Sequence, residues 1–114
     1  MFDRNLTKRQ RRVLRELADV AHSRELSAEL TKLEEDFRRW RTGELDPHEL
    51  SDLIHVFHQG PSRKLFTRYT DTSKTIAVAY ALMHGIIDES EVEAEILELL
   101  RPTLGFFRDQ QASR

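Results

Sequence analysis

The chain has 114 residues, of which 39% are hydrophobic and 33% charged, and its net charge is −2. This length fits one domain with one core, and the absence of cysteine excludes disulfides, thiolate metal sites and a cysteine nucleophile. The longest apolar run, residues 76–83, is too short to span a membrane. No apolar stretch follows the charged N-terminus, as it would in a secretory signal, so we expect a cytoplasmic protein with no membrane contact.

Charge is distributed unevenly along the chain. Residues 1–15 hold six basic side chains and one acid, whereas residues 86–100 hold six acids and no base. Such a chain can pair its two charged segments internally or pair head to tail with a second copy. A dedicated nucleic-acid-binding domain would be more basic overall.

The first two predicted helices cover residues 7–21 and 26–41. Thr7 and Gln10 have the spacing of a capping box at the start of the first helix. His22 and Ser23 mark a possible break, and the pattern leaves open whether residues 7–41 form one helix or two. Gly43 is the expected left-handed cap at the end of the second helix.

The third predicted helix begins after Asp46, which can cap it together with Glu49, while Pro47 suits the first helical position. Leu50, Leu53, Ile54 and Phe57 make its expected buried face. The pair Gly60-Pro61 predicts that this helix stops. A short fourth element over residues 62–69 then follows.

The segment 73–84 is apolar on every side, which predicts a helix surrounded by the others. The last helix is expected over residues 89–100, with its end at Pro102, leaving Leu104, Phe106 and Phe107 as an apolar patch in the tail. The predicted fold is therefore all-α: a single domain, residues 1–114, in which about five helices surround the buried helix 73–84.

One apolar stripe in the second helix indicates a lengthwise helical partner. Its residues are spaced alternately by four and three, which places them in one seam. Together with the tail aromatics, it predicts an oligomer interface made of Leu26, Leu30, Leu33, Phe37, Trp40, Phe106 and Phe107. We expect a homodimer, because a chain this small cannot easily hide so much apolar edge.

The turn expected at Gly60-Pro61 suggests an anion site. If Ser62 caps a new helix, the free amides of Arg63 and Lys64 and the positive end of the helix dipole attract an anion. His58 adds a charge that depends on pH. The candidate anion-binding residues are His58, Ser62, Arg63, Lys64 and Arg68. In the competing structural interpretation, Arg63 and Arg68 pair with acids such as Glu44, Asp46 or Asp52.

Other chemistry has little support in the sequence. The string Asp52, His55, His58 resembles metal ligation, but helical spacing turns Asp52 and His55 toward solvent, so we expect no metal site. No phosphate loop, H-E-x-x-H or G-x-S-x-G motif is present, so we assign no catalytic residues and no cofactor, and the sequence favours a non-enzyme. The basic face of helix 7–21 leaves weak nucleic-acid association as a second alternative.

Residues 54–69, IHVFHQGPSRKLFTRY, resemble a segment of the form IHxFHxGxxRxLxxRY in a family of small, uncharacterised bacterial all-helical proteins. The resemblance covers about an eighth of the chain and implies no activity. The sequence therefore favours a small helical interaction or accessory protein that forms homodimers. The alternative is a module that uses residues 55–69 to bind or transform a small anion.

Overall fold

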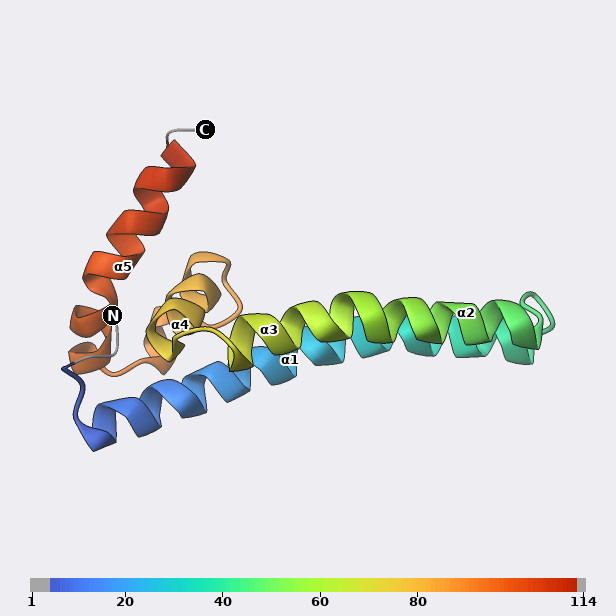
Figure 1. Cartoon of the computed structure of the whole chain (residues 1–114), viewed down its shortest axis with the longest axis horizontal. Helices are drawn as coiled ribbons and strands as arrows, with labels where there is room; N and C mark the ends of the chain where they lie inside the picture. Colours follow the sequence, from blue (N-terminus) through green and yellow to red (C-terminus); the bar gives the residue numbers. More distant parts are fainter. Residues whose placement is uncertain (1–4, 113–114) are drawn as a thin grey trace.

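The computed structural model describes residues 5–112, and Figure 1 shows a long helical hairpin joined at one end to a smaller group of helices. In chain order the elements are α1 (Lys8–Arg41), α2 (Pro47–Phe57), the π-helical turn η1 (His58–Ser62), α3 (Arg63–Thr70), α4 (Lys74–Met83), the 3₁₀ turn η2 (Glu89–Glu91) and α5 (Ala94–Ala112). The described residues contain no strand, which confirms the all-α prediction.

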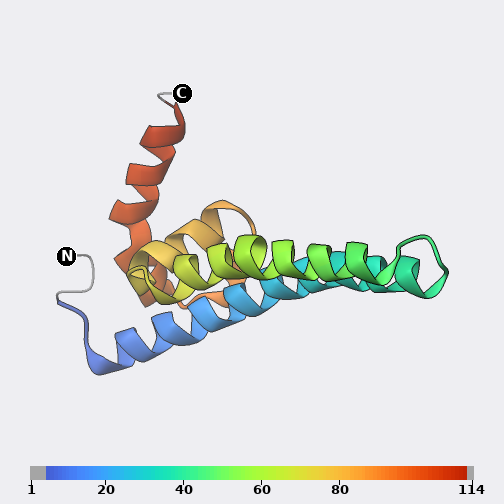
Figure 2. The ribbon, with the colours of Figure 1, turned by 45° about the vertical axis from the view of Figure 1, so that its right-hand side comes forward.

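The predicted bundle of about five helices differs from the observed arrangement. Residues 8–41 form one continuous helix, and α2, η1 and α3 follow one another without a break, so that the described helices make four rods. α1 and the α2–α3 rod lie side by side along most of the molecule, and α5 points away from them (Figure 2). The resulting shape is elongated, with extents of 54 × 34 × 25 Å.

Local capping signals place three of the chain's turns as the sequence predicts. Thr7 accepts a hydrogen bond from the Gln10 amide, and Asp46 accepts one from the Glu49 amide; both capping boxes are complete. Gly43 has φ +83°, in the left-handed region that the turn between α1 and α2 requires. Each of these contacts spans three residues or fewer, so the sequence alone specifies it.

The predicted helix stop at Gly60-Pro61 is wrong. Pro61 has no N–H to give to a carbonyl one turn earlier, and its ring crowds that carbonyl. The chain responds by widening into the π turn η1 and remains helical. Packing of α2 and α3 along α1 keeps the rod continuous, so tertiary contact outweighs the low helix propensity of these two residues.

The core lies at the end of the molecule where α1, α4 and α5 meet. Five residues of α4 are buried, as expected for the apolar segment 73–84, but Tyr80 and Ile76 are only half-buried, so the other helices do not surround α4 on every side. The largest fully buried side chains are Leu14, Ile87, Ile96, Leu100, Val78 and Thr75. We call this end of the molecule the base.

The last helix differs from its predicted bounds at both ends. Asp88 caps η2 instead of a long helix, and α5 begins at Ala94 and passes through Pro102. The apolar spacing of Ile96 and Leu100 continues to Leu104, which is also buried in the base. This burial favours a continued helix more strongly than Pro102 favours a stop.

The two oppositely charged segments meet in the base. Arg9 donates to Glu93 at 2.7 Å, and Gln10 donates to Glu95 at 2.9 Å. Arg24, further along α1, binds both carboxylate oxygens of Glu91 and the carbonyl of Ile86. The chain therefore pairs its charged ends internally, although Asp3 and Arg4 lie outside the described residues. Among residues 5–112, no helix is long and apolar enough to cross a membrane.

Candidate functional site

The half of the hairpin remote from the base has almost no interior. Within α1 the buried residues are Leu14, Ala18 and Ala21, so residues 22–41 contribute none. The rod beside it contributes Leu50 from α2, and Leu45 is buried in the connecting turn. We call this part, formed by residues 22–41 and 45–62, the arm. Two helices have only one contact line between them, so they cannot enclose the apolar side chains that both carry.

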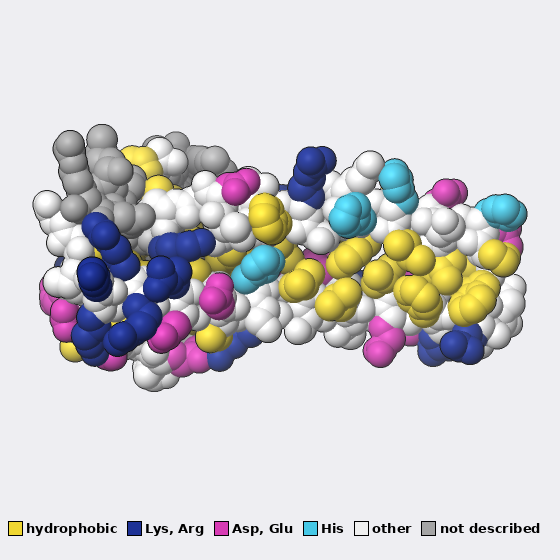
Figure 3. Space-filling model, turned by 60° about the horizontal axis from the view of Figure 1, so that its bottom comes forward, with side chains coloured by type: hydrophobic (Ala, Val, Ile, Leu, Met, Phe, Trp, Pro, Cys, Tyr) yellow, Lys and Arg dark blue, Asp and Glu magenta, His cyan; other side chains and the backbone are white. Residues whose placement is uncertain are grey.

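Large apolar side chains remain exposed on one side of the hairpin. Leu30 is 45% exposed, Phe37 39% and Ile54 38%, and Phe66 continues the row at the start of the base. These four residues define the arm face. The space-filling view shows a continuous apolar patch along the arm, with histidines along one edge and charged side chains along the other (Figure 3).

Helical spacing explains why these residues share a side. Leu30 and Phe37 are seven residues apart, which brings them to nearly the same angle around α1. On α2, Ile54 lies between buried Leu50 and exposed His58, at the border of the contact with α1. Val56, also exposed, lies about 160° around the helix from Ile54 at 100° per residue, on the opposite flank.

The structure divides the predicted oligomer interface into two separate places. Leu26, Leu33 and Trp40 are half-buried against the α2–α3 rod, while Leu30 and Phe37 stay open. The predicted inward position of Ile54 is therefore wrong, because α1 covers only part of the apolar stripe on α2. In the tail, Phe107 packs against the core and Phe106 is exposed, with 5.9 Å between their ring centroids.

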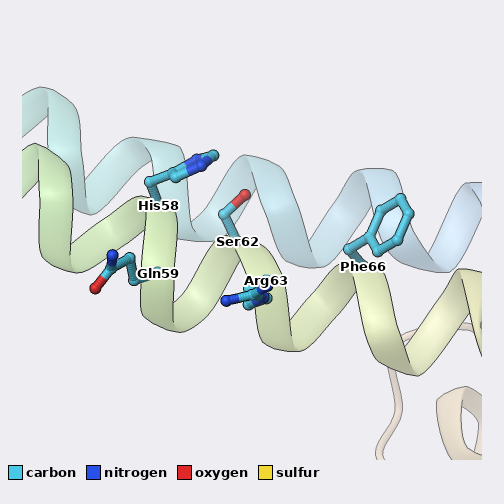
Figure 4. Close-up of a pocket in the computed structure, with 5 residues that line it drawn as sticks. All are labelled: His58, Gln59, Ser62, Arg63 and Phe66. Atoms are coloured by element: carbon cyan, nitrogen blue, oxygen red, sulfur yellow. The ribbon is translucent and has the colours of Figure 1, made fainter.

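The predicted anion site loses its structural basis at Ser62. Ser62 is helical and makes no capping hydrogen bond with its side chain, and the Arg63 amide donates to the Gly60 carbonyl. No helix begins there, so the amide of Arg63 is not free for an anion. Three of the five residues nevertheless line one shallow cavity of about 320 Å³ with Gln59 and Phe66 (Figure 4).

Lys64 and Arg68 lie on another surface, beside a second cavity of about 510 Å³. Arg68 donates from Nη1 to both carboxylate oxygens of Glu25, at 3.0 and 3.1 Å, and its guanidinium lies 4.2 Å from the Tyr80 ring centroid. The structural interpretation of Arg68 as an ion-pair partner is therefore confirmed, with Glu25 in place of the acids that the sequence suggested. Arg63 has no ion pair with any described residue.

Sequence reasoning missed Glu25 and Tyr69 as partners. The Tyr69 hydroxyl donates to Glu25 at 2.5 Å, and its ring stacks on His22 at 5.4 Å. Burial, aided by the hydrogen bond to Glu25, raises the pKa of Tyr69. Together these contacts fasten α3 to α1 where the arm leaves the base. More than forty residues separate the partners, so no local pattern could have indicated the cluster.

Within residues 5–112, no three histidine, aspartate or glutamate side chains are grouped to hold a metal ion, and Asp52, His55 and His58 are all exposed. Comparison with known proteins finds no matching protein family, curated protein or solved structure.

Proposed function

We propose that this protein is a small helical interaction or accessory protein whose arm face pairs with the arm face of a second copy. One observation supports this most directly: residues 22–41 form a helix of about 30 Å in which no side chain is fully buried and in which Leu30 and Phe37 remain exposed. Apolar surface of this extent on a small protein is typical of an interaction site.

A second copy is the partner whose geometry fits best. Two hairpins stacked through their arm faces make a four-helix arrangement, which encloses side chains that a helix pair leaves open. With two helices each about 10 Å across, the face measures about 30 by 20 Å. A standard interface takes about 800 Å² of accessible surface from each partner, and the flat area of this face is about three-quarters of that value. The net charge of −2 gives little repulsion between copies.

Two glutamate substitutions on α2 test the proposal by sedimentation at micromolar concentration. Ile54→Glu puts a charge on the arm face, whereas Val56→Glu puts the same charge on the opposite flank of the same helix, at a residue that is even more exposed. We expect dimers for the native chain and for Val56→Glu, and monomers that keep their helical circular dichroism for Ile54→Glu.

Three outcomes contradict the proposal. A strictly monomeric native chain rejects self-association. If Ile54→Glu and Val56→Glu dissociate the dimer equally, the arm face is not the specific interface. If Phe106→Ser dissociates the dimer while Ile54→Glu leaves it intact, the tail is the interface instead. Phe37→Glu repeats the test from α1, in case Ile54→Glu fails to fold.

The anion-binding alternative now has a narrower basis. It retains the cavity lined by His58, Ser62 and Arg63, but the Arg63 amide on which it depended donates to the Gly60 carbonyl. Phosphate should raise the melting temperature if the cavity binds an anion, and Arg63→Ala should remove that increase. An unchanged melting temperature rejects this alternative. Weak nucleic-acid association through helix 7–21 is tested by adding a short DNA duplex at physiological salt.

A further inference from the structure

The basic residues at the start of α1 fall into two groups that differ in their partners. Arg9 binds Glu93, and Arg24 binds Glu91, so the acids that precede α5 neutralise this flank of the helix. Arg11 and Arg15 lie on the other flank, toward α4, and neither forms an ion pair with a described residue. One side of α1 is therefore compensated, and the other keeps its positive charge.

This uncompensated flank lines a hollow of about 280 Å³, which we call the basic groove. It is formed by Leu6, Arg11, Leu14, Arg15 and Lys74. Lys74, the first residue of α4, is half-buried and donates to the carbonyl of Tyr69, a neutral acceptor that leaves its charge in place. Leu14 is fully buried beneath the groove, so the accessible apolar surface of the lining comes from Leu6, which is half-buried. None of the described residues that line the groove is acidic.

We propose that the basic groove binds a small carboxylate that carries a short apolar body. Three cationic side chains around one hollow favour an anionic group, and the planar guanidinium of arginine pairs with a carboxylate through two parallel hydrogen bonds. Arg11 and Arg15 are four residues apart, so their side chains are neighbours on the helix surface. Leu6 contacts the apolar body, and the volume of about 280 Å³ lies just below the usual range for small-molecule sites, which suits a short ligand.

The apolar lining distinguishes this ligand from a nucleic acid. A phosphate backbone is bound by a long basic stripe and makes no use of leucine side chains. A stripe on α1 would include Lys8 and Arg12 as well as Arg11 and Arg15, yet neither Lys8 nor Arg12 lines the groove. Arg12 instead lies 4.0 Å from Glu16. Binding of a nucleic acid should therefore depend on Arg12, whereas binding of a small carboxylate in the groove should not.

Thermal melting with hexanoate as the probe tests the proposal. Acetate supplies the carboxylate without the apolar body, and 1-hexanol supplies the body without the charge. We expect hexanoate to raise the melting temperature at concentrations where acetate and hexanol do not. Arg15→Ala should remove at least half of that increase, whereas the matched control Arg12→Ala should retain it. Ile54→Glu, which is remote from the groove, should also retain it whether or not the protein dimerises.

Three results overturn the proposal. If acetate raises the melting temperature as much as hexanoate does, the effect is a general salt effect. If Arg12→Ala and Arg15→Ala reduce the hexanoate effect equally, the ligand does not bind specifically in the basic groove. A short DNA duplex that protects more than hexanoate, and depends on Arg12 as much as on Arg15, identifies the face as a nucleic-acid surface. If Arg15→Ala alters the circular dichroism, Arg11→Ala and the isothermal titration of hexanoate into the native chain decide the question.

Discussion

The base and the arm both contain helices with large apolar side chains, but they differ in how completely those side chains are buried. In the base, Ile96, Leu100 and Val78 are completely shielded from solvent by three rods that meet at an angle (Figure 1). In the arm two rods run side by side, and Leu30 and Phe37 of α1 remain open. The same long helix, α1, takes part in both regions. Its neighbours, rather than its own sequence, determine where it has an interior.

This difference indicates where the chain's stability and its interactions are located. Burial of a large apolar side chain contributes about 1.5–3 kcal/mol, and the base holds the side chains for which that contribution is complete. The arm gains only part of it within one chain. Further gain is available to the arm through contact with another surface, which is the physical reason for proposing it as the interaction region.

Leucine-to-alanine substitutions in the base and in the arm should give the largest difference in the free energy of unfolding. Leu100→Ala leaves a cavity in the base and should lower the free energy of unfolding by about 2–5 kcal/mol. Leu33→Ala makes the same chemical change in the arm, where the side chain is half-exposed, and should cost about 1–2 kcal/mol. Urea unfolding followed by circular dichroism measures both values.

Protein concentration sharpens this comparison. If the arm face is paired, the loss caused by Leu30→Ala, which lies on that face, should increase as concentration rises, because dimerisation then contributes to stability. The loss caused by Leu100→Ala should change less, since Leu100 is already enclosed within one chain. Equal losses for the two variants at every concentration would contradict the distinction between base and arm.

The junction between the regions should be sensitive to Glu25. Glu25→Ala leaves the Arg68 guanidinium and the Tyr69 hydroxyl without their acceptor in a site that is only about one-fifth exposed. We expect a loss of about 2–3 kcal/mol in urea unfolding, together with faster amide hydrogen exchange in α3. The matched control is Glu29→Ala, one turn along and beside the same cavity, whose partner Lys32 is exposed. That variant should lose at most about 1 kcal/mol. Equal losses for the two variants would show that Glu25 contributes no more to stability than an exposed ion pair does.

The features that the sequence predicts correctly are local or periodic. The capping box at Asp46 and the left-handed Gly43 depend on residues close in the chain, and the apolar run 76–83 indicates a central helix through its composition. Two of the three prolines give wrong predictions of a helix end, and for the same reason. Pro61 and Pro102 both disfavour a helix locally, but contact with α1 in one case and burial of Leu104 in the other holds the helix together.

The candidate sites show a second limit. The spacing from Leu26 to Trp40 predicts a lengthwise partner, and α2–α3 is such a partner, but periodicity cannot tell how much of the stripe that partner covers. The predicted anion residues separate because the expected turn at Gly60 is a π turn, which places Arg63 and Arg68 beside different cavities. The contact between Glu25 and Arg68 depends on how the hairpin closes, which no short segment specifies.

The smallest expected effect concerns acid, and it arises from the ion pair between Arg24 of α1 and Glu91. The ion pair with Arg24, together with the Asp88 amide, lowers the pKa of Glu91 to about 2 from its ordinary value of 4.5. Because the pKa is lower in the folded protein, ionised Glu91 stabilises it above about pH 4.5, and that stabilisation is lost progressively as the pH falls toward 2.

Glu91→Gln should therefore flatten the decline in stability between those pH values and lower stability at pH 7. The effect is modest because the pair is solvent-exposed, and urea midpoints measured from pH 7 to pH 2 test it. Glu98→Gln, which removes the exposed partner of Arg101, should leave the profile unchanged, and an unaltered profile for Glu91→Gln would contradict the prediction.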